Sequence, residues 1–195
     1  MYTWGYIKEN TLSKLNLEEK EANELGLLSR FPYYANEAMT QICSAIKPRT
    51  KFVEFVIGKE RNNLGAVLVM PDDFVSFNDD VVTLLTEHNE YLIDVGEEYV
   101  EYYGYNELIF NAYGTYRIPY NARWFFFTKD THNATVIPAP ADVCDAIPSY
   151  IASQCLKIDD EVKAATYRNE YEMFLARIDD TSFRRQRTFH VGGDW

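Results

Sequence analysis

Apolar residues recur at helical spacing at both ends of the chain, whereas the middle follows a strand-like pattern. An expected first helix, capped by Thr3, carries on its inward face Trp4, Ile7, Leu12 and Leu15. The acidic stretch that follows, 17–28, is mostly helical in pattern and breaks near Gly26. A further helix is expected over 33–46, before Pro48 stops it.

The C-terminal part, from Ala146 to Ile178, predicts two amphipathic helices joined by a short acidic turn at 159–161. Apolar residues three and four positions apart form one stripe on each helix. In the first helix the stripe is Ile147, Tyr150, Ile151, Cys155 and Ile158, and in the second it is Val162, Ala165, Tyr171, Phe174, Leu175 and Ile178.

Between these helical parts, short apolar runs alternate with glycine, asparagine and aspartate, which are typical turn residues. The expected strands cover 51–57, 66–70, 74–77, 81–85, 91–95, 99–103, 107–113, 124–127 and 135–137. Strands of this length and spacing predict a small antiparallel sandwich or barrel. We therefore expect an α+β fold: a helical bundle, made of the N-terminal helices and the C-terminal helical hairpin, with an inserted antiparallel β module.

The pattern divides the chain into three parts. Residues 1–50 and 138–182 are expected to form one discontinuous helical domain, and residues 51–137 the inserted β module. Residues 183–195 show no clear period and contain two adjacent glycines, so we expect an extended C-terminal tail that a partner orders.

The charge of the chain narrows the range of partners. The formal net charge is −11 and the pI is near 4.7, so the free protein should be repelled by nucleic acid. Residues 183–195 hold three arginines against one aspartate, a net charge of +2, which leaves −13 on the remainder. A basic tail on an acidic body predicts that the tail binds an acidic protein surface.

The sequence indicates a protein made and used in a cytoplasm. No apolar run approaches the ~20 residues needed to span a bilayer, and the N-terminus lacks the pattern of a secretory signal, so we expect no membrane partner. Cys43, Cys144 and Cys155 are odd in number and form no CxxC motif. They are expected to be small buried residues in a reducing compartment.

No pattern of residues indicates catalysis. His88, His132 and His190 are scattered, and the sequence has no metal-ligand spacing, no phosphate-binding loop and no nucleophile motif. Adjacent carboxylates such as Asp72 and Asp73 fall in predicted turns and do not face each other across a cleft. We expect no enzyme, no catalytic residue, no cofactor and no bound metal.

The chain is rich in tyrosine, with 15 residues, many of them in the predicted β module. The candidates there are Tyr91, Tyr99, Tyr102, Tyr103, Tyr105, Tyr113, Tyr116 and Tyr120. They fit cross-strand packing and subunit contacts, and they also fit a platform that stacks against sugar rings.

Two stretches resemble tailed-bacteriophage head-to-tail connector (adaptor) proteins. The first is the hairpin AIPSYIASQCLKIDDEVKAATYRNEYEMFLARI, residues 146–178, and the second is LLSRFPYYANEA, residues 27–38. Together with the first helix, they cover about half of the chain. Many such connectors have only a loop or a short hairpin where this chain has its predicted β module, so the contacts of that module are left open.

The resemblance implies a structural virion protein, assembled in the bacterial host cytoplasm. Such a protein would form a ring of itself, commonly of twelve copies, beneath the portal at the phage neck. It would bridge the portal to a tail or second neck protein and form part of the DNA channel, so that genomic DNA passes without specific binding. The tail would reach the portal, with partner-binding candidates Phe183, Arg184, Arg185, Arg187, Phe189, His190 and Trp195.

A second hypothesis belongs to a different functional class. The β module would bind a carbohydrate or a receptor and be carried on a helical stalk in a phage tail. It predicts glycan binding that is lost when exposed tyrosines are removed, whereas a connector predicts assembly with itself or with the portal.

Overall fold

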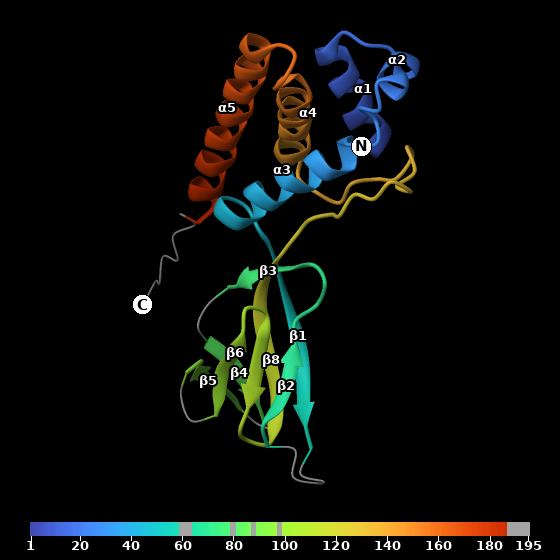
Figure 1. Cartoon of the computed structure of the whole chain (residues 1–195). Coiled ribbons are helices and arrows are strands. Elements are labelled where there is room, and N and C mark those ends of the chain that lie inside the picture. The colour runs from blue at the N-terminus through green and yellow to red at the C-terminus, as the bar shows by residue number, and fades with distance from the viewer. Residues whose placement is uncertain (59–63, 79–80, 87–88, 97–98, 187–195) are drawn as a thin grey trace. The chain divides into compact units, whose positions relative to one another are not determined.

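The computed structural model has an α+β fold, which confirms the predicted fold class. It describes residues 1–58, 64–78, 81–86, 89–96 and 99–186, with only the backbone for residue 45 and residues 179–186. The described helices are α1 (Trp4–Leu15), α2 (Glu19–Glu24), α3 (Phe31–Ala45), α4 (Ala141–Leu156) and α5 (Glu161–Gln186). The strands are β1 (Arg49–Ile57), β2 (Ala66–Val69), β3 (Phe74–Phe77), β4 (Val81–Leu85), β5 (Glu90–Asp94), β6 (Val100–Gly104), β7 (Glu107–Phe110) and β8 (Gly114–Ala122) (Figure 1).

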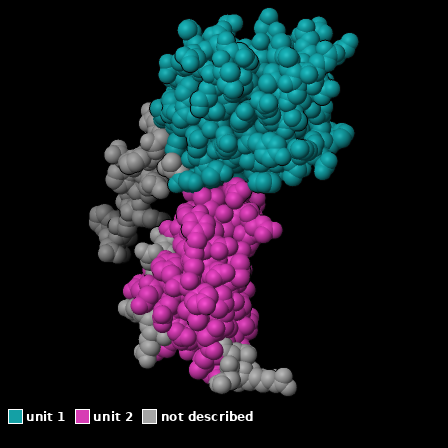
Figure 2. Space-filling view, in the orientation of Figure 1, with its two compact units in different colours: residues 1–47, 124–195 teal, residues 48–123 magenta. Residues whose placement is uncertain are grey.

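The chain divides into two compact units, coloured separately in Figure 2. The helical unit comprises residues 1–47 and 124–195, and the β unit comprises residues 48–123. The sequence pattern placed these divisions at 50/51 and 137/138. In the structure the first division lies three residues earlier, and the second lies 14 residues earlier because residues 124–137 belong with the helices.

The ends of the N-terminal helices follow from local chemistry. The Thr3 side chain accepts a hydrogen bond from the Tyr6 backbone N–H, which satisfies one of the donors that a helix start leaves free. Helix α1 ends at Asn16 in the left-handed conformation, which asparagine tolerates better than most residues. Helix α3 has Pro32 in its first turn, where no backbone N–H is needed.

Helices α4 and α5 form the predicted hairpin and pack along each other. Tyr150 and Ile151 of α4 are buried against the bundle, and so are Tyr171 and Ile178 of α5. Burying a large side chain of this kind contributes about 1.5–3 kcal/mol, so this stripe holds the hairpin in place.

Part of the predicted hairpin stripe is wrong. Ile158 is 89% exposed and Val162 is 79% exposed, and Ala165 is exposed as well. Ile158 lies in the turn after α4, outside the helical period. In α5 the buried stripe begins at Ala164, and Val162 is two residues away, roughly 200° around the helix.

Residues 124–137 do not form the two strands predicted at 124–127 and 135–137. Their only strand-like pairing among the described residues is the isolated bridge between Thr3 and Val136. The backbone instead runs beside the start of α1, where Trp4 N–H donates to Thr135 O at 3.0 Å and Ile137 N–H donates to Tyr2 O at 2.9 Å.

Side chains of the helical unit hold the first part of this segment. The Asn36 amide donates to Phe127 O and accepts from Phe127 N–H, both at 2.8 Å. The Phe127 ring packs on Trp4 at 4.8 Å, and Trp124 Nε1 donates to Lys47 O at 2.9 Å. The aromatic run 124–127 therefore packs into the helical unit, which explains why strand propensity misled the prediction.

The β unit consists of two antiparallel sheets. One sheet has the order β1-β8-β4-β5, with β3 also pairing β8, and the other has the order β2-β7-β6. Their inward residues form one core: Ile57, Met70, Phe74, Val82, Val100, Leu108, Phe110, Tyr116, Ile118, Tyr120 and Ala122. This arrangement of two sheets over a shared core matches the sandwich-like module expected from the sequence.

Strand β8 is the central strand of the larger sheet, and the sequence analysis missed it. Gly114 and Pro119 are unusual residues for a central strand, although Tyr116, Ile118 and Tyr120 alternate as a buried strand should. The Pro119 carbonyl accepts from Asn78 N–H at 3.5 Å. The Pro119 nitrogen, which has no hydrogen to donate, faces the same side of β8 as this carbonyl, near the junction of β3 and β4. The ladder between β8 and β1 therefore loses no donor.

Candidate functional site: the groove between helices α4 and α5

The predicted tail residues lie at and beyond the end of α5. Phe183, Arg184 and Arg185 belong to its last turns, where only the backbone is described. The helix continues to Gln186, so an extended tail beginning at 183 is wrong for 183–186. No glycine or proline interrupts α5, and arginine and glutamine favour helix. Arg187, Phe189, His190 and Trp195 lie outside the described residues.

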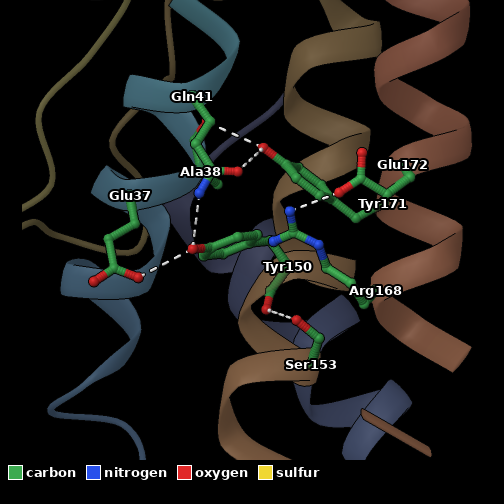
Figure 3. A network of polar contacts seen from close by, with 8 residues as sticks. All are labelled: Glu37, Ala38, Gln41, Tyr150, Ser153, Arg168, Tyr171 and Glu172. Carbon is green, nitrogen blue, oxygen red and sulfur yellow. Dashed lines mark hydrogen bonds and ion pairs between the residues drawn. The ribbon is translucent and has the colours of Figure 1, made fainter. Parts of the chain in front are cut away.

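A network of two tyrosines and an arginine joins helices α3, α4 and α5 (Figure 3). The Tyr150 hydroxyl donates to Glu37 Oε2 at 3.2 Å and accepts from Gln41 Nε2 at 3.1 Å. The Tyr171 hydroxyl lies 3.4 Å from two acceptors, Ala38 O and Gln41 Oε1. A hydroxyl has one proton, so these two acceptors share a single donor.

Arg168 covers the two tyrosine rings. Its guanidinium carbon lies 5.4 Å from the Tyr150 ring centre and 5.3 Å from that of Tyr171, while the two rings are 4.9 Å apart in an edge-on arrangement. Arg168 also pairs with Glu172 one turn later at 2.6 Å. Stacking and pairing both fix the planar guanidinium, a geometry that lysine could not reproduce.

The tyrosines of this network act as hydrogen-bond donors. Burial is the main cause that raises the pKa of Tyr150, and the nearby Glu37 raises it further. Burial also raises the pKa of Tyr171, which is the more buried of the two tyrosines. Both hydroxyls therefore keep their protons at neutral pH, and neither is activated as a base or nucleophile.

A groove of about 500 Å³ lies next to this network, between α4 and α5. Its lining consists of Ser153, Gln154, Lys157, Glu161, Ala164, Ala165 and Arg168. The two alanines leave room between the helices, and the long polar side chains surround it. The lining therefore carries both charge signs, with Lys157 and Arg168 against Glu161.

The sequence pattern did not single out this network. The sequence did contain an indication of part of the network. Tyr171 and Glu172 follow Arg168 by three and four residues on one helix, and side chains at these spacings are neighbours. Their partners on α3 could not be identified from spacing, because they lie more than a hundred residues earlier.

The eight tyrosines of the β unit differ in burial, and Tyr113 is half-buried. Tyr116 and Tyr120 are buried in its core, whereas Tyr91, Tyr99, Tyr102, Tyr103 and Tyr105 are exposed. Tyr105 is held by its hydroxyl, which donates to Val75 O at 2.8 Å. A hollow of about 610 Å³ at the ends of β1, β4 and β8 has Tyr113 as its single aromatic side chain. The exposed tyrosines therefore do not line this hollow.

The described residues contain no group of three or more histidine, cysteine or carboxylate side chains placed to hold a metal ion. None of the described helices combines the length and the apolar character needed to cross a membrane.

Comparison of the chain with protein-family models and with curated proteins gives no match in either case.

Proposed function

We propose that this chain is a structural virion protein, a head-to-tail connector that forms an oligomeric ring beneath the portal at a phage neck. The observation that carries the proposal is the hairpin of α4 and α5. It contains residues 146–178, the stretch whose amino-acid sequence resembles the connector family. The proposed role is mechanical, and the protonated tyrosines and the paired arginine of the network beside the groove suit that role.

The surface of the hairpin supports self-assembly. Helix α5 has 26 residues and packs mainly along α4, with side-chain contacts to Lys14 of α1 and Ala38 of α3. Along its other side Val162 is exposed and Met173 is 59% exposed, and Ile158 is exposed in the preceding turn. Head-to-tail contacts through such a face close into a ring when each copy is rotated from the next by a fixed angle.

The charge of the chain supports a channel lining that does not hold DNA. Each copy carries −11, so a ring of about twelve copies would repel the phosphate backbone. We propose that genomic DNA passes through without specific binding. The ring would connect the portal to a tail or second neck protein, and the basic residues from Phe183 onward would dock on the portal.

The deciding experiment is the mass of the purified full-length chain, measured alone and after mixing with the portal protein encoded in the same genome. We expect a ring-sized species, either free or bound to the portal. A chain that remains monomeric in both samples would contradict the connector proposal.

The five exposed tyrosines of the β unit favour one alternative, a carbohydrate- or receptor-binding module on a helical stalk in a phage tail. A glycan array probed with the same preparation separates the two proposals. Glycan binding that disappears in Tyr103→Ala would support the alternative. Ring formation without binding to any glycan on the array would support the connector proposal.

A further inference from the structure

The larger sheet of the β unit ends in a long strand whose outer side pairs with none of the described strands. Strand β1 pairs with β8 over all nine of its residues, from Arg49↔Ala122 to Ile57↔Gly114, without a register shift. On the other side of β1 no strand is paired among the described residues. The other edge strands, β2, β5 and β6, have four or five residues, and β6 contains a register irregularity.

The backbone groups that β1 directs outward follow from Pro119. In a strand, the N–H and C=O of one residue point to the same side, and the side alternates from residue to residue. Pro119 O accepts from Asn78 N–H, and Arg123 N–H donates to Asp73 O, so the odd-numbered residues of β8 face away from β1. The even-numbered residues of β8 consequently bond the odd-numbered residues of β1.

Because the register pairs Phe52 with Pro119, the alternation continues along β1. The residues that direct both backbone groups to the open edge are Thr50, Phe52, Glu54 and Val56. They offer four donors and four acceptors at two-residue intervals, which is the spacing that an added strand requires.

The side chains of the same residues leave the edge accessible. Phe52 is 62% exposed and Val56 is 68% exposed, on the face of the sheet opposite the core. Natural edge strands are commonly protected by a proline, a bulge or covering structure, and β1 has neither a proline nor a bulge. Between the two apolar side chains, Glu54 pairs with Arg117 of β8 at 3.0 Å.

Charge indicates the kind of strand that fits. Residues 48–123 contain six basic and thirteen acidic residues, a formal charge of −7. A strand from a second acidic β unit would add to this charge, whereas a basic strand would offset it. We propose that the open edge of β1 is a strand-addition site for an extended, basic segment of a partner protein with apolar residues at alternate positions.

The first measurement is amide hydrogen exchange in the free full-length chain, resolved by residue with NMR. We expect the amides of Thr50, Phe52, Glu54 and Val56 to exchange at least about tenfold faster than those of Lys51, Val53 and Phe55. Equal protection of both sets would mean that the edge is already covered, and it would overturn the proposal.

The second measurement uses three nine-residue synthetic peptides, matched to the length of β1. One alternates valine and lysine, one alternates valine and glutamate, and one contains the lysines and valines in two separate blocks. We expect the alternating lysine peptide alone to slow exchange of the four outward amides and to shift their resonances. Equal binding of the glutamate or the block peptide would contradict the charge or the alternation, and no binding would contradict the site.

A matched pair of variants tests the backbone contact. Glu54→Pro removes one outward N–H and leaves the bonds to β8 intact, because the Glu54 amide does not face that strand. Glu54→Ala removes the same side chain and keeps the N–H. We expect Glu54→Pro to bind the alternating lysine peptide about tenfold more weakly than Glu54→Ala does. Equal affinity of the two variants would refute backbone pairing at β1.

These outcomes are independent of ring assembly. A chain that forms no ring but binds the peptide at β1 would contradict the connector proposal and support the strand-addition site. A chain that forms a ring but binds no peptide would support the connector proposal and contradict the strand-addition site.

Discussion

Tyr120 illustrates how a single buried side chain links strands of the β unit. Its ring lies in the core with 3% of its surface exposed, and its hydroxyl donates to Asp73 Oδ1 at 3.1 Å. Lys51, the cross-strand neighbour of Tyr120, pairs with the same carboxylate. Burial, and after it the hydrogen bond to Asp73, raises the pKa of Tyr120 to about 12. The sequence marked Tyr120 as one of many tyrosines, and only the fold separates it from the exposed ones.

This pKa predicts a loss of stability in alkali. The folded state holds the Tyr120 proton up to about pH 12, whereas an unfolded tyrosine loses it near pH ~10, so the folded state binds more protons between these values. The free energy of unfolding should therefore be unaffected by this group below pH ~10 and fall as the pH rises toward 12. We expect Tyr120→Phe to flatten that decline in urea unfolding curves measured from pH 8 to 12.

The control for this prediction is Tyr103→Phe, because Tyr103 is 65% exposed. It should leave the alkaline slope as it is in the unaltered chain. A slope that is the same in all three proteins would contradict the role assigned to Tyr120.

At the scale of elements, the spacing of apolar residues and the positions of turn residues identified most helices and strands. The Thr3 cap could be predicted because it depends on a few neighbouring residues. Strand β8 and the segment 124–137 could not, because both depend on distant partners. Pro119 is tolerated in a central strand owing to the side it faces, and Phe127 is held by Asn36 across 91 positions.

The Asn36 contact gives a prediction for that segment. Asn36→Ala leaves the Phe127 N–H and C=O without their side-chain partner, so we expect a loss of about 1–3 kcal/mol in the free energy of unfolding. Faster proteolysis within 124–137 should accompany it. Asn10→Ala is the matched control, since Asn10 Nδ2 only donates to Tyr6 O on an exposed surface, and it should change stability by less than about 0.5 kcal/mol. Equal effects of the two substitutions would argue against the role of Asn36.

At the scale of the whole molecule, the chain is two units with separate cores, and the β unit is an insertion into the helical one. The two ends of the insertion are adjacent: Arg49 pairs with Ala122 at the start of the ladder between β1 and β8. On the helical side, Trp124 Nε1 reaches Lys47 O. Each unit therefore has its ends held together without the other.

Excision tests this independence. We expect the fragment 48–123 to fold alone, with dispersed NMR amide signals and cooperative unfolding, because its core and its closing ladder are internal. The complementary chain, with a short glycine-serine linker between Lys47 and Trp124, should retain its helical circular dichroism. A fragment 48–123 without dispersed signals would contradict the division.

The proposed portal contact predicts the effect of shortening the chain. Ending it after residue 182 removes Phe183, Arg184 and Arg185 together with the segment beyond α5, and should abolish binding to the portal while thermal unfolding stays unchanged. Ending it after Gln186 keeps the complete helix and separates the role of the last helical residues from that of 187–195. Portal binding that survives the shorter chain would refute the role of this region.

The sequence by itself determined the α+β class, most of the helices and strands, the hairpin at 146–178 and the acidic charge, because period, caps, turn residues and charge are local or additive properties. The tertiary structure decided the central place of β8, the packing of 124–137, the burial of Ala164 in place of Val162, the tyrosine–arginine network and the open edge of β1. Each of these depends on which distant segments meet and on which side of a strand or helix they meet. That information lies in the packing of the two cores and not in any single stretch of residues.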